Sequence, residues 1–230
     1  MQLILDHVSK KFDNKVILTD VSYTFEKGKI YGLLGKNGAG KTTLFNCISQ
    51  HLMVDSGEIT VNGNRNYNST EIGYVYAMPK LPAFMTGYEF VKYFIDIHAD
   101  VMMHVKEPAA YLLSVGIEEE AHHLLLRDYS HGMQNKVQML TSMVMAPPVL
   151  LLDEPLTSFD VVAAHEMKKL LLSIKRETII IFSTHILPLA QDLCDEVVLL
   201  HNQQLQGMSE SDFQSDAFEA QLMQIFSDTN

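Results

Sequence analysis

The residues from Gly35 to Thr42 read GKNGAGKT and match the pattern G-x-x-x-x-G-K-[ST]. Glycines at these positions let the backbone curl, so that its N–H groups converge on one anion. The stretch follows the apolar run KIYGLLG and precedes LFNCIS, which favours a helix whose dipole directs its positive end to the same place. The spacing therefore predicts a phosphate site, in which Lys41 pairs with phosphate groups and the Thr42 hydroxyl ligates Mg²⁺. The alternative is a glycine-rich turn that matches by chance.

An acidic pair, Asp153 and Glu154, follows the apolar run VLLL. A phosphate loop needs a second magnesium anchor from a neighbouring strand. We expect Asp153 to hold the ion, directly or through water, and Glu154 to polarise an attacking water. A solvated pair that ends a strand without a chemical role is the other interpretation.

A histidine, His185, follows a further apolar run, IIIFST. Because the carboxyl ends of parallel strands face the ligand in such folds, His185 is predicted to reach the γ-phosphate. An ordinary polar residue at a strand end remains an open interpretation.

The elements that must hold these residues follow an α/β pattern. VLLLDEP and TIIIFSTH are continuous apolar runs, typical of strands buried on both faces of a parallel sheet, and VVAAHEMKKLLLSIK between them favours a helix with Asp160 as its N-cap. Val21, Tyr23 and Phe25 alternate with polar residues, as in a half-buried strand. GEITVNGN predicts a strand that ends in a type I′ turn at Asn62-Gly63.

Helical patterns replace strands in the middle of the chain. GYEFVKYFIDIH, PAAYLLSVGI and EEEAHHLLL predict helices, and we expect an inserted helical subdomain at approximately residues 80–128. EVVLLHNQQLQGM predicts a closing hairpin near Gly207. A helical tail is expected over 208–230, where apolar residues have roughly helical spacing: Phe213, Phe218, Leu222, Ile225 and Phe226.

Composition limits the function classes. A chain of 230 residues that is 47% hydrophobic suits one domain with a sizeable core. Its net charge of −11, without a basic patch, disfavours a nucleic-acid partner. The two cysteines show no metal or disulfide spacing, and MQLILDHVSKKF lacks a basic leader. The longest uncharged apolar run, Val137–Leu152, is too short to span a bilayer, so we expect a cytosolic protein.

Five motifs occur in order: the phosphate loop, YSHGMQ, VLLLDEP, SFD and STH. Together they resemble the nucleotide-binding subunit of ATP-binding cassette (ABC) transporters. The resemblance implies an α/β P-loop NTPase fold, with a RecA-like core, an antiparallel β portion and an inserted α-helical subdomain, as a single domain over residues 1–207. It also implies ATP and Mg²⁺ as ligands, separate transmembrane permease subunits and a second ABC subunit, identical or paralogous. The location would be cytoplasmic, peripheral on the inner face of the cell membrane.

The resemblance assigns roles to matching residues. Phe12 would stack on adenine beside Val16, although an ordinary core aromatic is a second interpretation of Phe12. Glu154 would be the general base, His185 the γ-phosphate switch, and Asp160 in SFD would communicate between two sites. The nucleotide-binding residues would be Phe12, Val16, Gly35, Lys36, Asn37, Gly38, Ala39, Gly40, Lys41, Thr42 and Thr43, and the Mg²⁺ ligands Thr42 and Asp153.

YSHGM is similar to the family's signature motif, LSGGQ, which closes over the ATP held by the partner subunit. The signature residues would be Ser130, His131, Gly132 and Met133. His131 replaces a glycine and Met133 a glutamine, and serine-x-glycine-methionine forms resemble a subgroup associated with exporters. Ser130 and the N–H groups around Gly132 would still meet a γ-phosphate at a helix N-terminus.

A second departure is Ala77 in IGYVYAMPKLP, where the family has a glutamine that touches Mg²⁺ and the attacking water. Alanine has no side-chain hydrogen-bonding group. We expect slow ATP hydrolysis that powers transport, by export, with the membrane subunit docked near Tyr76–Phe90. An ATP-dependent regulator without transport is an alternative. An ABC protein that acts on ribosomes or DNA is another, which the acidic charge disfavours.

Overall fold

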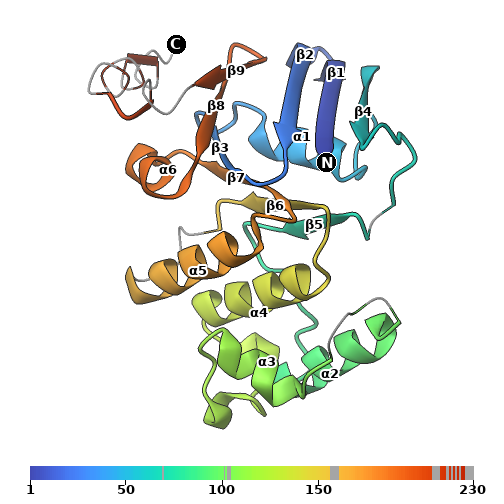
Figure 1. Cartoon of the computed structure of the whole chain (residues 1–230), viewed down its shortest axis with the longest axis vertical. Helices are drawn as coiled ribbons and strands as arrows, with labels where there is room; N and C mark the ends of the chain where they lie inside the picture. The colour runs from blue at the N-terminus through green and yellow to red at the C-terminus, as the bar shows by residue number, and fades with distance from the viewer. Residues whose placement is uncertain are drawn as a thin grey trace.

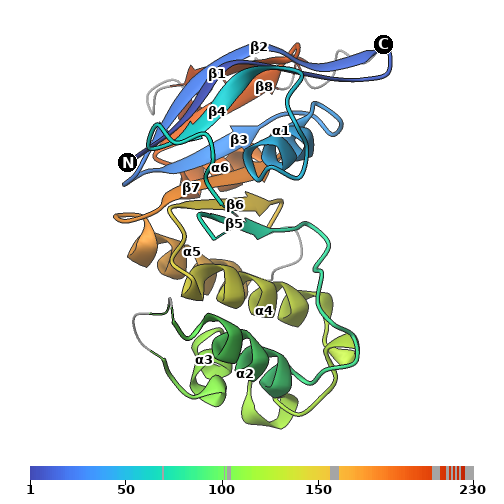
Figure 2. The ribbon, with the colours of Figure 1, turned by 90° about the vertical axis from the view of Figure 1, so that its right-hand side faces the viewer.

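The structure, a computed structural model, describes residues 1–68, 70–100, 102, 105–155, 161–208, 213–215, 218, 220, 222 and 224–225, without the side chains of 161–164, 166 and 167. Its layers follow one another along the longest axis (Figures 1 and 2). An antiparallel sheet lies at one end beside one edge of a six-stranded sheet, and the other edge of that larger sheet lies next to helices α4 (His131–Val144) and α5 (Val161–Ile174). Helices α2 (Gly87–His98) and α3 (Pro108–Ser114) form the opposite end.

The six-stranded sheet has the order β5-β6-β7-β3-β8-β9, in which β5 to β8 pair in parallel and β9 pairs antiparallel to β8. Every residue of β3, β6 and β7 is buried, which confirms the prediction made from their continuous apolar runs. The predicted closing hairpin is β8 and β9. The strands are β5 (Ile72–Val75), β6 (Val149–Asp153), β7 (Ile179–Thr184), β3 (Ile30–Leu34), β8 (Glu196–His201) and β9 (Gln204–Met208).

The smaller sheet has the order β2-β1-β4, with both pairs antiparallel. Its strands are β1 (Gln2–Phe12), β2 (Lys15–Glu26) and β4 (Ser56–Val61). The alternation predicted in β2 is confirmed, because Val21 and Phe25 are buried. After β4, Asn62 and Gly63 have φ values of 52° and 78°, as the predicted type I′ turn requires.

Two cores hold the six-stranded sheet in place. On one face, Leu33, Leu151 and Ile181 pack with the antiparallel sheet and with α1 (Lys41–Ile48). On the other face, Leu150 and Phe182 pack with α4, α5 and α6 (Leu187–Leu193). The sheet is therefore covered on both sides, and its carboxyl-terminal edge carries the phosphate loop between β3 and α1.

The helical insert has its own core between α2, α3 and one face of α4. Helix α2 begins with a capping box, in which Thr86 and Glu89 each bond the other's backbone N–H. The helices predicted from GYEFVKYFIDIH and PAAYLLSVGI are confirmed.

The prediction of a helix over EEEAHHLLL is wrong, since this stretch has a 3₁₀ turn at Glu119–Ala121 and ends at Leu126, where a second one, Leu126–Asp128, begins. Its carbonyl groups bond elsewhere: those of His122 and Leu124 accept from the backbone N–H groups of Tyr88 and Gly87 at the start of α2. The ring of His122 is buried, with Nε2 2.9 Å from the carbonyl oxygen of Ile117. Long-range bonds therefore replace the intrahelical ones.

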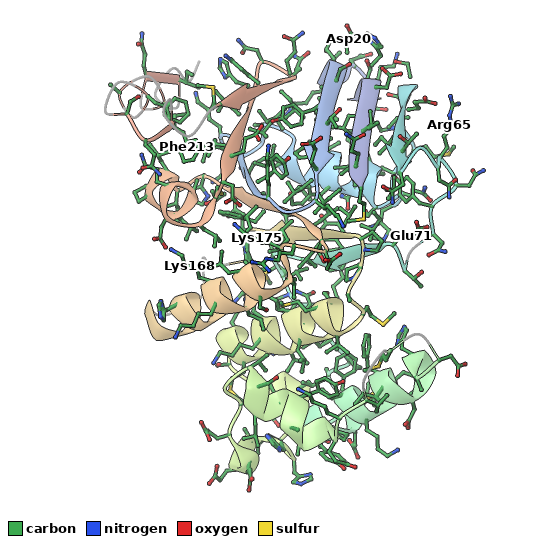
Figure 3. All side chains as sticks on the ribbon, in the orientation of Figure 1. Asp20, Arg65, Glu71, Lys168, Lys175 and Phe213 are labelled. Atoms are coloured by element: carbon green, nitrogen blue, oxygen red, sulfur yellow. The ribbon has the colours of Figure 1, made fainter. Side chains whose placement is uncertain are left out.

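The tail packs against the end of the sheet. Phe213, labelled in Figure 3, is buried with Phe218 and Leu222 against α6 and β8. Phe226 and most of the tail lie outside the described residues, so the tail helix stays a prediction. In the part of the chain that the structure describes, no helix is long and apolar enough to cross a bilayer.

Candidate active site

The phosphate loop connects β3 to α1 and depends on glycine at two of its positions. Gly40 is the N-cap of α1 with φ 108°, and a Cβ there would lie 2.7 Å from Cγ2 of Ile17. A Cβ at Gly35 would lie 2.9 Å from the carbonyl oxygen of Leu200 on β8. Since larger residues do not fit at these two positions, the neighbouring strands impose the tight course of the loop.

Lys41 opens α1 and points its side chain back into the loop. Its Nζ donates to the carbonyl oxygens of Gly35 at 2.7 Å and Lys36 at 3.2 Å, and lies 3.7 Å from Oε1 of Glu154. Burial lowers the pKa of Lys41, and the nearby carboxylates of Glu154 and Asp153 counter this shift. The loop thus holds an ammonium group where the glycines and the helix N-terminus converge.

Asp153 is the meeting point of three elements. It ends β6 and is buried, its Oδ2 accepts from the Thr42 hydroxyl of α1 at 2.8 Å, and its Oδ1 accepts from the Ser183 hydroxyl of β7 at 2.6 Å. A carboxylate beside a hydroxyl is the type of oxygen donor set that suits a hard cation such as Mg²⁺. Elsewhere in the described residues, no group of three or more His, Cys, Asp and Glu side chains forms an alternative metal site.

Glu154 and His185, the residues that follow β6 and β7, lie together. Nδ1 of His185 is 3.2 Å from Oε1 of Glu154. The backbone of Glu154 has φ 48°, an uncommon conformation for a residue with a Cβ. Its N–H donates to the Ser183 hydroxyl at 3.0 Å, so Ser183 orients Asp153 and Glu154 at once.

The sequence reasoning missed Ser183, whose only signal was a small polar residue within an apolar strand. It also missed Tyr74 on β5. The Tyr74 ring stacks on Tyr76 with centroids 4.3 Å apart. Burial, followed by the charge of Asp153, raises the pKa of Tyr74 above its ordinary value, so the phenol stays protonated.

A cleft of about 320 Å³ adjoins the phosphate loop. Val16 lines it, together with Lys36–Ala39 and the β8–β9 turn, Leu200–Gln203. Phe12 pairs with the cleft residue Lys15 across the β1–β2 turn and is 43% exposed, so it is not a core aromatic. The cleft lies between the phosphate loop, the start of β2 and the β8–β9 turn, and the contribution of this turn had no signal in the sequence.

The signature residues stand at the start of α4. Ser130 is its N-cap and accepts from the N–H of Met133 at 3.2 Å, and His131, Gly132 and Met133 form the first helical turn. The N-terminus of a helix is a place where backbone N–H groups can meet an anion, and here the Ser130 side chain occupies the N–H of Met133. Ala77, just after β5, is exposed, and Asp160 lies outside the described residues.

The fold and this site define a P-loop NTPase. A family model described as ABC transporter matches residues 18–157, and the chain belongs to the ATP-binding proteins of that family. It is 31% identical over 238 residues to the ABC transporter ATP-binding protein NatA of Bacillus subtilis, covering 94% of each chain. It is also 32% identical over 187 residues to a fluoroquinolones export ATP-binding protein of Mycobacterium tuberculosis, covering 78% of this chain and 60% of that protein.

Solved structures confirm the predicted fold class. An ATP-binding subunit of an ABC transporter superimposes with a TM-score of 0.83 and 23% identity, covering 97% of this chain and all of that one. A bacterial ABC transporter cassette solved as a dimer superimposes with a TM-score of 0.78 and 20% identity, covering 90% of this chain and 98% of its own. These similarities establish the P-loop fold.

Proposed function

We propose that this chain hydrolyses ATP with Mg²⁺ and thereby powers transport through separately encoded membrane subunits. The observation that carries the proposal is the convergence of Thr42, Asp153, Glu154 and His185 beside the phosphate loop. Every polar group that phosphoryl transfer to water needs is present at this edge: an ammonium, oxygen ligands and a general base.

In the proposed reaction, the loop N–H groups and Lys41 bind the β- and γ-phosphates and offset the charge that develops on them. A magnesium ion held by Thr42 and Asp153 would neutralise phosphate charge and orient the oxygens. Glu154 accepts a proton from the attacking water. His185, hydrogen-bonded to Glu154, orients this base and faces the γ-phosphate.

The rest of the proposed nucleotide site follows the same geometry. Phe12 and Val16 hold the adenine at the cleft beside the loop, and the remaining loop residues bind phosphate through their backbone: Gly35, Lys36, Asn37, Gly38, Ala39, Gly40 and Thr43. We assign residues 1–207 to one nucleotide-binding domain, with a helical subdomain at 80–128 and a C-terminal helical tail at 208–230.

A second ABC subunit completes the proposed site, with the signature of each subunit over the ATP of the other. Ser130, His131, Gly132 and Met133 would contact the partner's nucleotide, and Asp160 would link the two sites. A solved cassette with a related fold is described as a dimer bound to ADP and phosphate, which supports this arrangement.

Transport is proposed to run outward, by analogy with the fluoroquinolones export protein, from a cytoplasmic location on the inner face of the membrane. Met78 and Phe84 support docking of a membrane subunit between β5 and α2, since they are 73% and 79% exposed. Ala77 favours a second candidate, an ATP-dependent regulator that moves no substrate. Transport assays in vesicles that contain the membrane subunits separate the two.

The catalytic proposal is tested by ATP hydrolysis with Lys41→Ala. We expect this variant to lose at least about 100-fold in kcat/KM, because it removes charge that stabilises the transition state. Lys92→Ala is the matched control, since Lys92 forms an exposed ion pair with Asp96 on α2, and it should keep wild-type activity. Equal activity of the two variants would refute the assigned phosphate site.

A further inference from the structure

Lys10 is a mostly buried lysine that contacts Phe12 near the end of β1. Its side chain is 12% exposed, and its Nζ lies over the Phe12 ring, 5.4 Å from the centroid. An ammonium group over an aromatic ring is attracted by the negative charge of the ring face. Phe12 itself is 43% exposed, so Lys10 holds the ring from one side while much of the residue stays open to a ligand.

Asp55, which directly precedes β4, fixes Lys10 and the backbone around it. Its Oδ1 accepts from Nζ of Lys10 at 2.9 Å, and its Oδ2 accepts from the N–H of Lys11 at 2.7 Å. The Asp55 N–H donates to the carbonyl oxygen of Ser9 at 2.9 Å. The bond from Lys10, followed by the one from Lys11, holds the pKa of Asp55 below its ordinary value. Asp55 therefore anchors the stretch of β1 that leads to Phe12.

This anchor lies where the regular pairing of β1 ends. The pairing with β4 ends at Ser9 and Ser56, and the pairing with β2 shifts its register between Lys10 and Lys11. Phe12 is the last residue of the strand. An exposed side chain at such a place loses rotamer freedom when a ligand stacks on it, and this cost falls if the side chain is already held. The contact with Lys10 orders the ring in this way before a ligand binds.

We infer that Lys10, fixed by Asp55, is a positioning residue that holds the Phe12 ring ready to stack on the adenine base of ATP. The inference rests on the proposed function, because it needs Phe12 in the adenine site. Stacking depends on the orientation of both rings, so a ring held on one face presents the other face to the base. Lys10 and Asp55 act through Phe12, and their effect is confined to the part of the affinity that depends on the base.

The test compares two ligands of the full chain by calorimetry in Mg²⁺: AMP-PNP, a non-hydrolysable ATP analogue, and inorganic triphosphate, which has no base. The ratio of the two affinities measures what the base and the ribose contribute. Lys10→Met removes the ammonium group and keeps an unbranched side chain. It should lower the ratio by about threefold to fivefold and leave the affinity for triphosphate unchanged. Lys10→Arg keeps a cation that can lie over the ring and bond the carboxylate, so it should keep the ratio near the wild-type value.

Lys29→Met is the matched control. Lys29 also combines an ion pair, 3.1 Å from Glu196, with an aromatic ring, 5.9 Å from the centroid of Tyr31, but it precedes β3 at the end away from the phosphate loop. This variant should keep the wild-type ratio. An unchanged ratio in Lys10→Met, or equal losses of affinity for both ligands, would overturn the inference.

Phe12→Ala distinguishes a failure of the inference from a failure of the adenine site. It should lower the ratio at least as much as Lys10→Met, because it removes the stacking ring itself. If Phe12→Ala leaves the ratio unchanged, the assignment of Phe12 to the adenine site is wrong, and the inference falls with it. If Phe12→Ala lowers the ratio and Lys10→Met does not, the adenine site stands and the role of Lys10 alone is refuted.

Discussion

Ser183 connects the two acidic residues of the site, Asp153 and Glu154, through hydrogen bonds of its hydroxyl group. Its hydroxyl donates to Asp153, accepts from the N–H of Glu154, and is fully buried. Sequence reasoning identified both acids from the phosphate loop's need for a magnesium anchor and a base. It did not identify Ser183, because a serine within an apolar strand can equally be a buried residue that only fills space in the core.

Ser183→Ala is expected to lower the free energy of unfolding by about 1–3 kcal/mol, because it removes one hydrogen bond from the buried Asp153 carboxylate and another from the Glu154 N–H. The rate of ATP hydrolysis should fall as well, since Glu154 loses the bond that fixes its backbone. Urea denaturation and steady-state hydrolysis measure the two effects. Ser173→Ala on α5 removes an exposed hydroxyl that bonds the carbonyl of Leu170, and it should change neither quantity. Similar stability of the two variants would contradict this role.

Gln138 joins two elements, α4 and the segment after β5. It is 5% exposed, donates from Nε2 to the carbonyl of Tyr76 at 2.9 Å, and accepts at Oε1 from the N–H of Lys80 at 3.3 Å. Lys80 also places its Nζ 3.9 Å from the centroid of the Tyr76 ring. The helix that begins with the signature residues is thereby fixed to the strand beside the magnesium site.

Gln138→Leu should release this segment, because it leaves the Tyr76 carbonyl and the Lys80 N–H without their partner. We expect amide hydrogen exchange in residues 76–80 to accelerate by about tenfold or more, consistent with a loss of about 1–3 kcal/mol. Gln138→Glu keeps an acceptor for Lys80 but loses the donor to Tyr76, and should give an intermediate rate. Unchanged exchange in Gln138→Leu would show that other contacts hold the segment.

Elements with strong local patterns were predictable from the sequence, and those decided by distant bonds were not. Continuous apolar runs identified β3, β6 and β7 because both faces of these strands are buried. The segment around His122 was not predictable in this way, since its apolar spacing is helical but its carbonyl groups accept from backbone N–H groups at the start of α2. The β8–β9 turn lines the cleft because of tertiary contacts, and such contacts leave no local pattern in the sequence.

Each molecule carries two parts of the proposed composite site, and they lie at two separate places on its surface. The phosphate loop, Asp153, Glu154 and His185 form one part, and the turn that begins α4 at Ser130 forms the other. The order of motifs along the chain predicted the overall fold correctly, and the roles it assigns to the two parts of the site stay predictions. A partner's contribution lies beyond any single chain, so the assembled state is the most informative property to measure.

The most direct measurement compares ATP hydrolysis by wild type and Glu154→Gln, with the mass of each recorded by light scattering in ATP and Mg²⁺. We expect wild type to hydrolyse ATP, and Glu154→Gln to lose at least about 100-fold in rate, because the general base is gone. The variant should accumulate as an ATP-dependent dimer, which disperses when ATP is removed. Hydrolysis that survives in Glu154→Gln, or two proteins that both stay monomeric and inactive, would contradict the proposal that this chain is an ATPase with a composite site.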